Sequence, residues 1–107
     1  MSKAHRLFQA IAATLSAAHP EVRAGRMMSS PALTLGGKVF AFFHRDEMAF
    51  RLGRDFDPGT FGVRRGAPLR PFKTKGPLLD WLQVPAEEAA RWEALAREAL
   101  RRMAAAR

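Results

Sequence analysis

Cysteine and tyrosine are both absent from this sequence of 107 residues. Without cysteine the chain has no disulfide framework, no zinc site built on thiolates and no cysteine nucleophile. Long apolar runs are also missing, because polar side chains interrupt the segment 7–18. We therefore expect neither a signal peptide nor a membrane span, and we expect a cytoplasmic protein.

The length fits one domain. A chain of this size buries somewhat over ~60% of the surface that it exposes when unfolded, which is enough for one core. No repeat, low-complexity tail or second domain is visible, so residues 1–107 are expected to form a single domain. Its stability has to come from packing alone.

Positive charge is in excess and is unevenly distributed. The formal net charge is +8, and residues 51–76 hold seven basic and two acidic side chains. Residues 77–107 hold five of each sign. A basic excess of this kind favours anionic partners without identifying them.

An amphipathic helix is expected over residues 3–18. Ser2 is a suitable N-cap residue, and Pro20 cannot continue the helix. The apolar residues recur at intervals of three and four, which places them on one face of a helix. They are Ala4, Leu7, Phe8, Ile11, Leu15 and Ala18.

Short extended segments follow, separated by turn signals. The expected strands are residues 22–28, 32–35, 38–44, 48–52 and 78–84. Gly36 and Gly37 predict a tight hairpin, because both positions of such a turn need positive φ. In residues 53–76 Gly, Pro and basic side chains predict a loop, with one helical turn at most, capped by Asp57 before Pro58.

A second amphipathic helix is expected over residues 86–105. Its apolar face consists of Trp92, Leu95, Ala96, Ala99, Leu100 and Met103. Three ion pairs have the favourable i,i+4 order, namely Glu87 with Arg91, Glu93 with Arg97, and Glu98 with Arg102. The sequence thus predicts an α+β fold with an N-terminal helix, an antiparallel sheet of four to five strands and a C-terminal helix. Both helices are expected to pack on one face of the sheet.

Four motifs occur in this order along the chain. They are Gly25-Arg26-Met27-Met28 with Pro31-Ala32-Leu33, then Gly37-Lys38-Val39-Phe40-Ala41, then Met48-Ala49-Phe50-Arg51-Leu52, and Asp80-Trp81-Leu82-Gln83-Val84-Pro85, followed by Trp92 and Ala99. Together they resemble the TfoX N-terminal domain, also called the TfoX/Sxy-like family, over about residues 5–104. The resemblance implies the same α+β fold. Because named members regulate natural competence and small members have no known catalytic residues, it implies a regulatory role.

The sequence departs from the family pattern in three places. Met28-Ser29-Ser30 stands where Met-Phe-Gly is usual, Arg51 stands where Lys is usual, and a Pro-rich loop replaces the helix before the last strand. The competence regulators also continue into a second, C-terminal domain. What the resemblance implies for this chain is therefore a regulatory domain of unspecified pathway.

Catalytic and metal-binding constellations are not evident. His5, His19 and His44 lack the i,i+4 spacing and the added carboxylate that a zinc site needs. Asp55 and Asp57 are explained by capping and local ion pairing. We expect no catalytic residues, no metal and no cofactor; catalysis would require the loop to close over a pocket containing His44 and Asp55.

The basic segment 51–75 is the strongest polar feature. Its candidate contacts to an anion or a nucleic acid are Arg51, Arg54, Arg64, Arg65, Arg70, Lys73 and Lys75. Phe61 and Phe72 are available to stack on unpaired bases. The alternative is a solvated loop whose arginines reflect the composition of the chain.

Aromatic residues crowd the segment 38–44. Strict alternation places Phe40 and Phe42 on the helix-covered face of the sheet. It assigns three residues to the other face: Val39, Ala41 and Phe43. An apolar face without helices is expected either to bind a second copy, giving a homodimer, or to be covered by the loop 54–76.

Two functions follow from these features. The first is a small non-enzymatic regulatory or protein-interaction module, a homodimer that acts on protein partners through its sheet face and helices. The second is an accessory nucleic-acid-binding protein that uses the basic loop 51–75. No membrane partner is expected.

Overall fold

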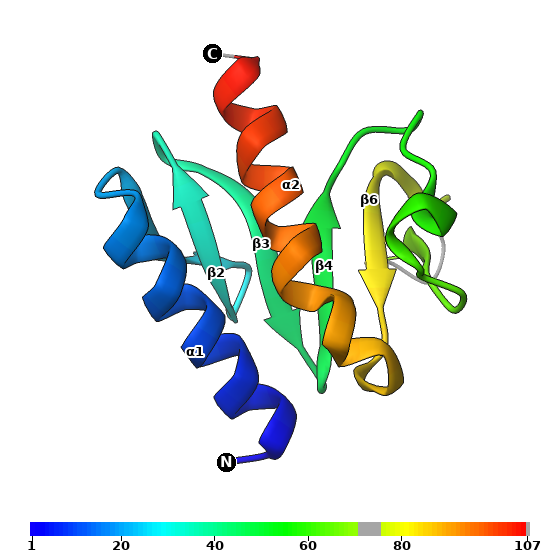
Figure 1. Cartoon of the computed structure of the whole chain (residues 1–107), viewed down its shortest axis with the longest axis horizontal. Helices are drawn as coiled ribbons and strands as arrows, with labels where there is room; N and C mark the ends of the chain where they lie inside the picture. Colours follow the sequence, from blue (N-terminus) through cyan, green and yellow to red (C-terminus); the bar gives the residue numbers. More distant parts are fainter. Residues whose placement is uncertain (71–75, 107) are drawn as a thin grey trace.

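A computed structural model describes residues 1–70 and 76–106 of the chain. In chain order the elements are α1 (Lys3–Ala18), β1 (Val22–Met27), β2 (Ser30–Leu35), β3 (Lys38–His44), β4 (Glu47–Arg51), the 3₁₀ helix η1 (Pro58–Phe61), β5 (Ala67–Leu69), β6 (Leu78–Val84), the 3₁₀ helix η2 (Ala86–Arg91) and α2 (Trp92–Ala105). Both α-helices lie across the same face of one sheet (Figure 1). The predicted α+β fold with both helices on one face is confirmed.

The sheet contains six strands in the order β1-β2-β3-β4-β6-β5, and all neighbours are antiparallel. This is one strand more than the upper number expected. The additional strand, β5, has only three residues and includes Pro68. A segment so short shows no alternation, and proline is acceptable only on an edge strand, which is the position of β5.

Local signals at the turns and caps behave as predicted. The Ser2 hydroxyl accepts a hydrogen bond from the His5 backbone N–H at 3.0 Å and caps α1. Gly36 and Gly37 have φ of 60° and 82° in the β2–β3 hairpin. Asp57 caps η1 by accepting from the Gly59 N–H at 3.0 Å. The short polar and glycine-rich signals of the sequence therefore mark real chain reversals.

The main core fills the space between the sheet and the helices. Phe8, Ile11 and Leu15 of α1 are buried there. Trp92 of α2 is fully buried, and its Nε1 donates a hydrogen bond to the backbone oxygen of Val84 at 3.3 Å. The predicted apolar faces of both helices thus meet the sheet.

A β-bulge changes the faces of β3. Leu33 pairs with Ala41 and Thr34 pairs with Val39, so one additional residue, Phe40, lies between these pairs on β3. Such an insertion inverts the alternation on one side of the bulge. Two residues of the predicted open face, Ala41 and Phe43, therefore belong to the helix-side core.

The face assignment from strict alternation is wrong for these two residues and for Phe42. Phe42 and Val39 lie on the face opposite the helices, in a second apolar cluster. The ring of Phe43 lies 5.0 Å from the imidazole of His5 and 6.2 Å from the ring of Trp92. Phe43 is thus covered by both helices and offers nothing to a second copy.

The predicted helix 86–105 is divided in two. Ala86–Arg91 forms 3₁₀ turns with a non-helical residue, Glu88, and the α-helix begins only at Trp92. Glu87 consequently pairs with Arg65 at 3.4 Å, because 3₁₀ geometry does not place it over Arg91. The other two predicted pairs are confirmed inside α2.

Candidate functional site

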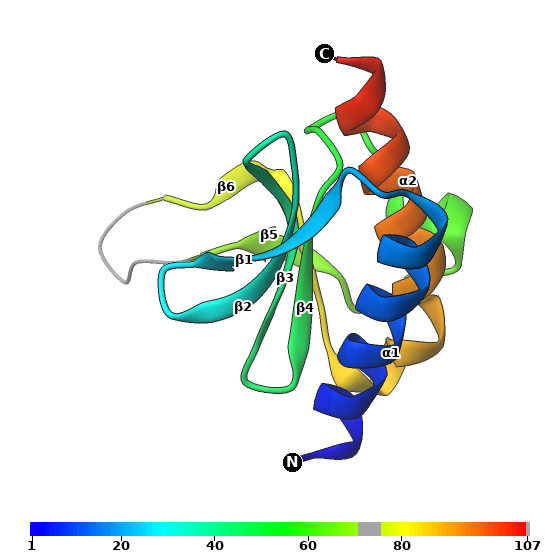
Figure 2. The same ribbon diagram turned by 90° about the vertical axis from the view of Figure 1, so that its left-hand side faces the viewer.

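A groove of about 670 Å³ lies on the face of the sheet opposite the helices. Residues of the β1–β2 turn, of the β3–β4 hairpin and of the end of β5 line it. Figure 2 shows the β1–β2 and β5–β6 segments extending to the side away from the helices. The groove is therefore bounded by two hairpins that are distant in sequence, with β3 and β4 beneath it.

The floor of the groove is apolar. Phe42, Ala49 and Leu69 line it, and together with Ala32 and Trp81 they form the second apolar cluster of the protein. The rings of Phe42 and Trp81 lie 5.4 Å apart, and the two residues are only 7% and 9% exposed. They present little ring surface to an unpaired base, because each ring is covered by the other and by its neighbours.

The described part of the segment 54–76, residues 54–70 and 76, contributes side chains to both faces of the sheet. Leu69 covers part of the helix-free face, next to Trp81. Phe56, Phe61 and Val63 instead pack against the helix-side core. In the described part of this segment, Leu69 thus covers the helix-free face at its β5 edge, next to the groove.

Two polar pairs lie at the end of the groove near the β1–β2 and β3–β4 turns. Ser30 Oγ and His44 Nδ1 are hydrogen-bonded at 2.8 Å, and Ser30 is buried whereas His44 is exposed. Gln83 Nε2 donates to Glu47 Oε1. His44 and Glu47 are opposite each other in the β3–β4 ladder, so the two pairs are neighbours.

The Ser30–His44 contact contains two of the parts of a serine nucleophile. A working arrangement also needs a group that orients the second imidazole nitrogen and donors for an oxyanion. In the part of the chain that the structure describes, no carboxylate hydrogen-bonds His44 Nε2. Asp55 is exposed in the loop after β4 and does not line the groove. The pocket with His44 and Asp55 that catalysis would require is not formed.

The three histidines occupy separate places. His5 stacks on Phe43, His19 lies 4.0 Å from a carboxylate oxygen of Glu21, and His44 is bonded to Ser30. Within residues 1–70 and 76–106, no three His, Cys, Asp or Glu side chains gather as metal ligands would.

Backbone strain is concentrated at one end of the groove. Among the described residues, positive φ outside glycine occurs at Met28 (57°), Arg45 (51°) and Asp46 (63°). Met28 and Arg45 line the groove, and Met28 is 66% exposed. All three residues stand in the two-residue turns of the β1–β2 and β3–β4 hairpins, where positive φ is the usual geometry and costs an L-residue roughly 1–2 kcal/mol.

Charges at the rim are unbalanced. Arg45 and Arg70 line the groove, and Glu47 is the one carboxylate among its lining residues. In the described part of the chain, no carboxylate oxygen lies within 4.0 Å of either guanidinium. The rim is therefore positively charged and has arginine donors that no acidic side chain occupies.

The predicted basic contacts are dispersed. Arg54 pairs with Asp80 at 3.7 Å and Arg65 with Glu87 at 3.4 Å. Arg51 lines a smaller hollow of about 250 Å³ at the far end of the sheet, next to Lys38. Of the seven predicted contacts the structure brings one, Arg70, to the groove; Lys73 and Lys75, like Phe72, lie outside the described residues.

Phe61 is partly covered by a neighbouring aromatic ring. Its ring lies 5.2 Å from the ring of Phe56, and both residues are half-buried against the main core.

The side chain of Glu88 is hydrogen-bonded to the backbone of the basic segment. Its carboxylate accepts hydrogen bonds from the backbone N–H groups of Arg64 at 2.8 Å and Arg65 at 2.6 Å. The Arg64 N–H is the main cause that lowers the pKa of Glu88, and the Arg65 N–H adds to it. Sequence reasoning missed this contact because it joins residues more than twenty positions apart through main-chain atoms.

Comparisons of the chain with protein-family models, with curated proteins and with solved structures gave no match. The resemblance to the TfoX N-terminal domain is carried by its sequence motifs and stays a prediction. In the described residues, neither α-helix combines the length and the apolar character that crossing a membrane requires.

Proposed function

We propose that this protein is a cytoplasmic, non-enzymatic protein-interaction module that binds its partner in the groove on the helix-free face of the sheet. The observation that carries the proposal is the combination of an apolar floor, made by Phe42 and Leu69, with a rim that bears Arg45 and Arg70. Protein-binding sites have this arrangement of an apolar centre within a polar border. A regulatory role, as the TfoX-like motifs imply, belongs to the same proposal.

The polar side chains of the groove support binding more than catalysis. Ser30 is paired with His44, and Glu47 with Gln83. Under this proposal the first pair ties the start of β2 to the end of β3, and the second ties β4 to β6. Both pairs then fix the shape of the groove, and neither acts on a substrate.

Nucleic-acid binding is the second candidate function. It is favoured by the exposure of all five arginines in the described part of the segment 51–75. Against it are the two ion pairs of Arg54 and Arg65 and the partial burial of Phe56 and Phe61. We assign these arginines to weak, salt-sensitive attraction of anions.

A homodimer stays a prediction, but the surface expected to form it differs from the one found in the structure. The face expected to form it loses Ala41 and Phe43 to the main core. A second copy in the groove would bring two positively charged rims together, and like charges across an interface oppose association. We therefore place a different protein in the groove.

The proposal is tested by recovering a partner with the purified protein and repeating the capture with groove variants. Met28→Gly removes one wall and Arg45→Asn removes one charge, and glycine and asparagine both accept the left-handed backbone. Arg6→Gln on the exposed side of α1 is the matched control. Loss of the partner with both groove variants, and its retention by the control, is the expected result.

Retention of the partner by both groove variants would move the interaction to another surface and contradict the proposal. Titration with short nucleic acids runs alongside. Binding that survives physiological salt, and is lost when Arg64 and Arg65 become Gln, would establish the second candidate instead.

A further inference from the structure

The charges of the groove identify the kind of side chain that it attracts. Arg45 belongs to the β3–β4 turn and Arg70 follows β5, so two separate segments direct guanidinium groups to one rim. Glu47, the carboxylate of the rim, already accepts a hydrogen bond from Gln83. A carboxylate ligand satisfies both arginines, whereas a cationic ligand would meet only a carboxylate that has a partner.

The floor identifies the other component. Phe42, Ala49 and Leu69 belong to one buried apolar cluster, and all three line the groove. Met27 and Met28 form the wall on the β1–β2 side. Methionine side chains are flexible and polarisable, and they adapt to the apolar side chains of different peptides.

We propose that the groove binds an extended acidic segment of a partner protein, with an apolar side chain packed between Met28 and the floor and flanking carboxylates on Arg45 and Arg70. The inference rests on the proposed function and names the chemistry of its partner. A second copy of this chain is the poorer occupant, because it carries the same rim and a net charge of +8. A nucleic acid is poorer too, because the floor offers it no exposed ring.

A variant at Met28 can show whether this residue serves binding or only the fold. Its φ of 57° is unfavourable for a side chain with Cβ, and glycine at this position relieves the strain. The Met28→Gly variant should therefore melt at the same temperature as the natural protein or higher. A residue kept only for the fold would not combine unchanged stability with weakened binding.

Three short, fluorescently labelled peptides provide the test, read by anisotropy. The first alternates Glu and Leu, the second replaces Glu by Gln, and the third replaces Leu by Ser. We expect the Glu–Leu peptide to bind about tenfold more tightly than either counterpart, with affinity that decreases as salt is raised. Arg45→Asn and Arg70→Gln should each weaken it about fivefold, as the loss of one exposed ion pair does. Arg6→Gln should have no effect.

Four results would overturn the inference. Equal binding of the Gln–Leu peptide would show that the groove takes peptides without acidic preference, which leaves the proposed function intact. Binding of none of the peptides, or unchanged binding by Met28→Gly, would remove the acidic segment from this groove. A dimeric mass that Met28→Gly converts to a monomer would assign the groove to a second copy. The capture experiment described above judges the interaction module separately.

Discussion

The ring of Phe43 stacks on the ring of Phe8 with 5.5 Å between their centroids, in the core between the sheet and α1. The ring of Trp92, from α2, lies edge-on to the ring of Phe43 with 6.2 Å between their centroids. One side chain of β3 therefore contacts both helices. Phe42, its neighbour in sequence, lies on the other face against Trp81.

We predict that Phe43→Ala lowers the free energy of unfolding by about 3–5 kcal/mol, because it leaves a cavity where three aromatic rings meet. A double-mutant cycle between Phe8 and Phe43, measured by denaturant unfolding, should give a coupling of about 0.5–1.5 kcal/mol. The matched cycle between Phe8 and Phe42 should give none, because the sheet separates the two rings. Coupling of Phe8 to Phe42 and not to Phe43 would show that β3 keeps strict alternation, and it would contradict the bulge.

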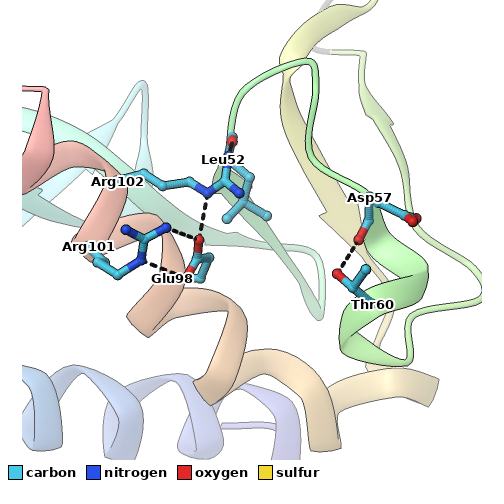
Figure 3. A network of polar contacts seen from close by, with 6 residues as sticks. All are labelled: Leu52, Asp57, Thr60, Glu98, Arg101 and Arg102. Carbon is cyan, nitrogen blue, oxygen red and sulfur yellow. Dashed lines mark hydrogen bonds and ion pairs between the residues drawn. The ribbon is translucent and has the colours of Figure 1, made fainter.

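The carboxylate of Glu98 binds Arg101 and Arg102 within α2, and Arg102 connects the helix to Leu52, the residue after β4 (Figure 3). The carboxylate accepts hydrogen bonds from Arg101 Nη2 at 2.6 Å and Arg102 Nε at 2.7 Å, and Arg102 Nη1 donates to the backbone oxygen of Leu52 at 2.8 Å. The hydrogen bonds from Arg101 and then Arg102 lower the pKa of Glu98 from 4.5 to about 2. The ionised form is thus favoured in the folded state.

We predict a loss of stability in acid that depends on Glu98. Since the folded pKa is below the unfolded value, the contribution is complete above about pH 4.5 and is lost as the pH falls through about 2. Solvent screening limits it to about 1–2 kcal/mol. Glu98→Gln should remove this part of the pH dependence in denaturant titrations, whereas Glu93→Gln, in a half-exposed pair with Arg97, should not. Identical pH profiles for the natural protein and Glu98→Gln would contradict the assignment.

Several parts of the fold follow from local sequence. Ser2, the Gly36-Gly37 pair and the alternation of Met48, Phe50 and Leu52 each act within a few residues, and each was predictable. The bulge at Phe40 was not, because it depends on how β3 pairs with β2. A one-residue insertion has no local signature among consecutive apolar side chains.

The candidate site was predictable to a small extent. Sequence reasoning selected Arg70 as a contact, but the groove also needs Met28 and Leu69, which come from hairpins at opposite edges of the sheet. Their proximity results from the twist and order of six strands, and β5 was too short to be recognised. The basic segment 51–75 was expected to form one surface. In the structure Arg54 pairs with Asp80, and Arg65 contacts Glu87 and Glu88, so its side chains are dispersed.

We predict that Glu88→Ala loosens residues 64–65 and leaves the core intact. The amide protons of Arg64 and Arg65 should exchange faster with solvent, because they lose the carboxylate that accepts them. The lowered pKa of Glu88 means that this protection is present above the usual carboxyl range and is lost on acidification. Arg65→Gln is the control: it removes the ion pair with Glu87 and keeps both backbone contacts, so protection should persist.

We predict that Ser30 has a structural role and is not a nucleophile. Ser30→Ala should cost about 0.5–1.5 kcal/mol, the net value of one hydrogen bond, because it removes the contact with His44 Nδ1 at 2.8 Å. Ser29→Ala at the exposed neighbouring position is the control and should have a smaller effect. A serine-directed fluorophosphonate, followed by mass spectrometry, should give no adduct at Ser30, since the described residues supply no carboxylate to orient the imidazole. An adduct that disappears with Ser30→Ala or His44→Gln would contradict the non-enzymatic proposal, because only an activated hydroxyl reacts in this way.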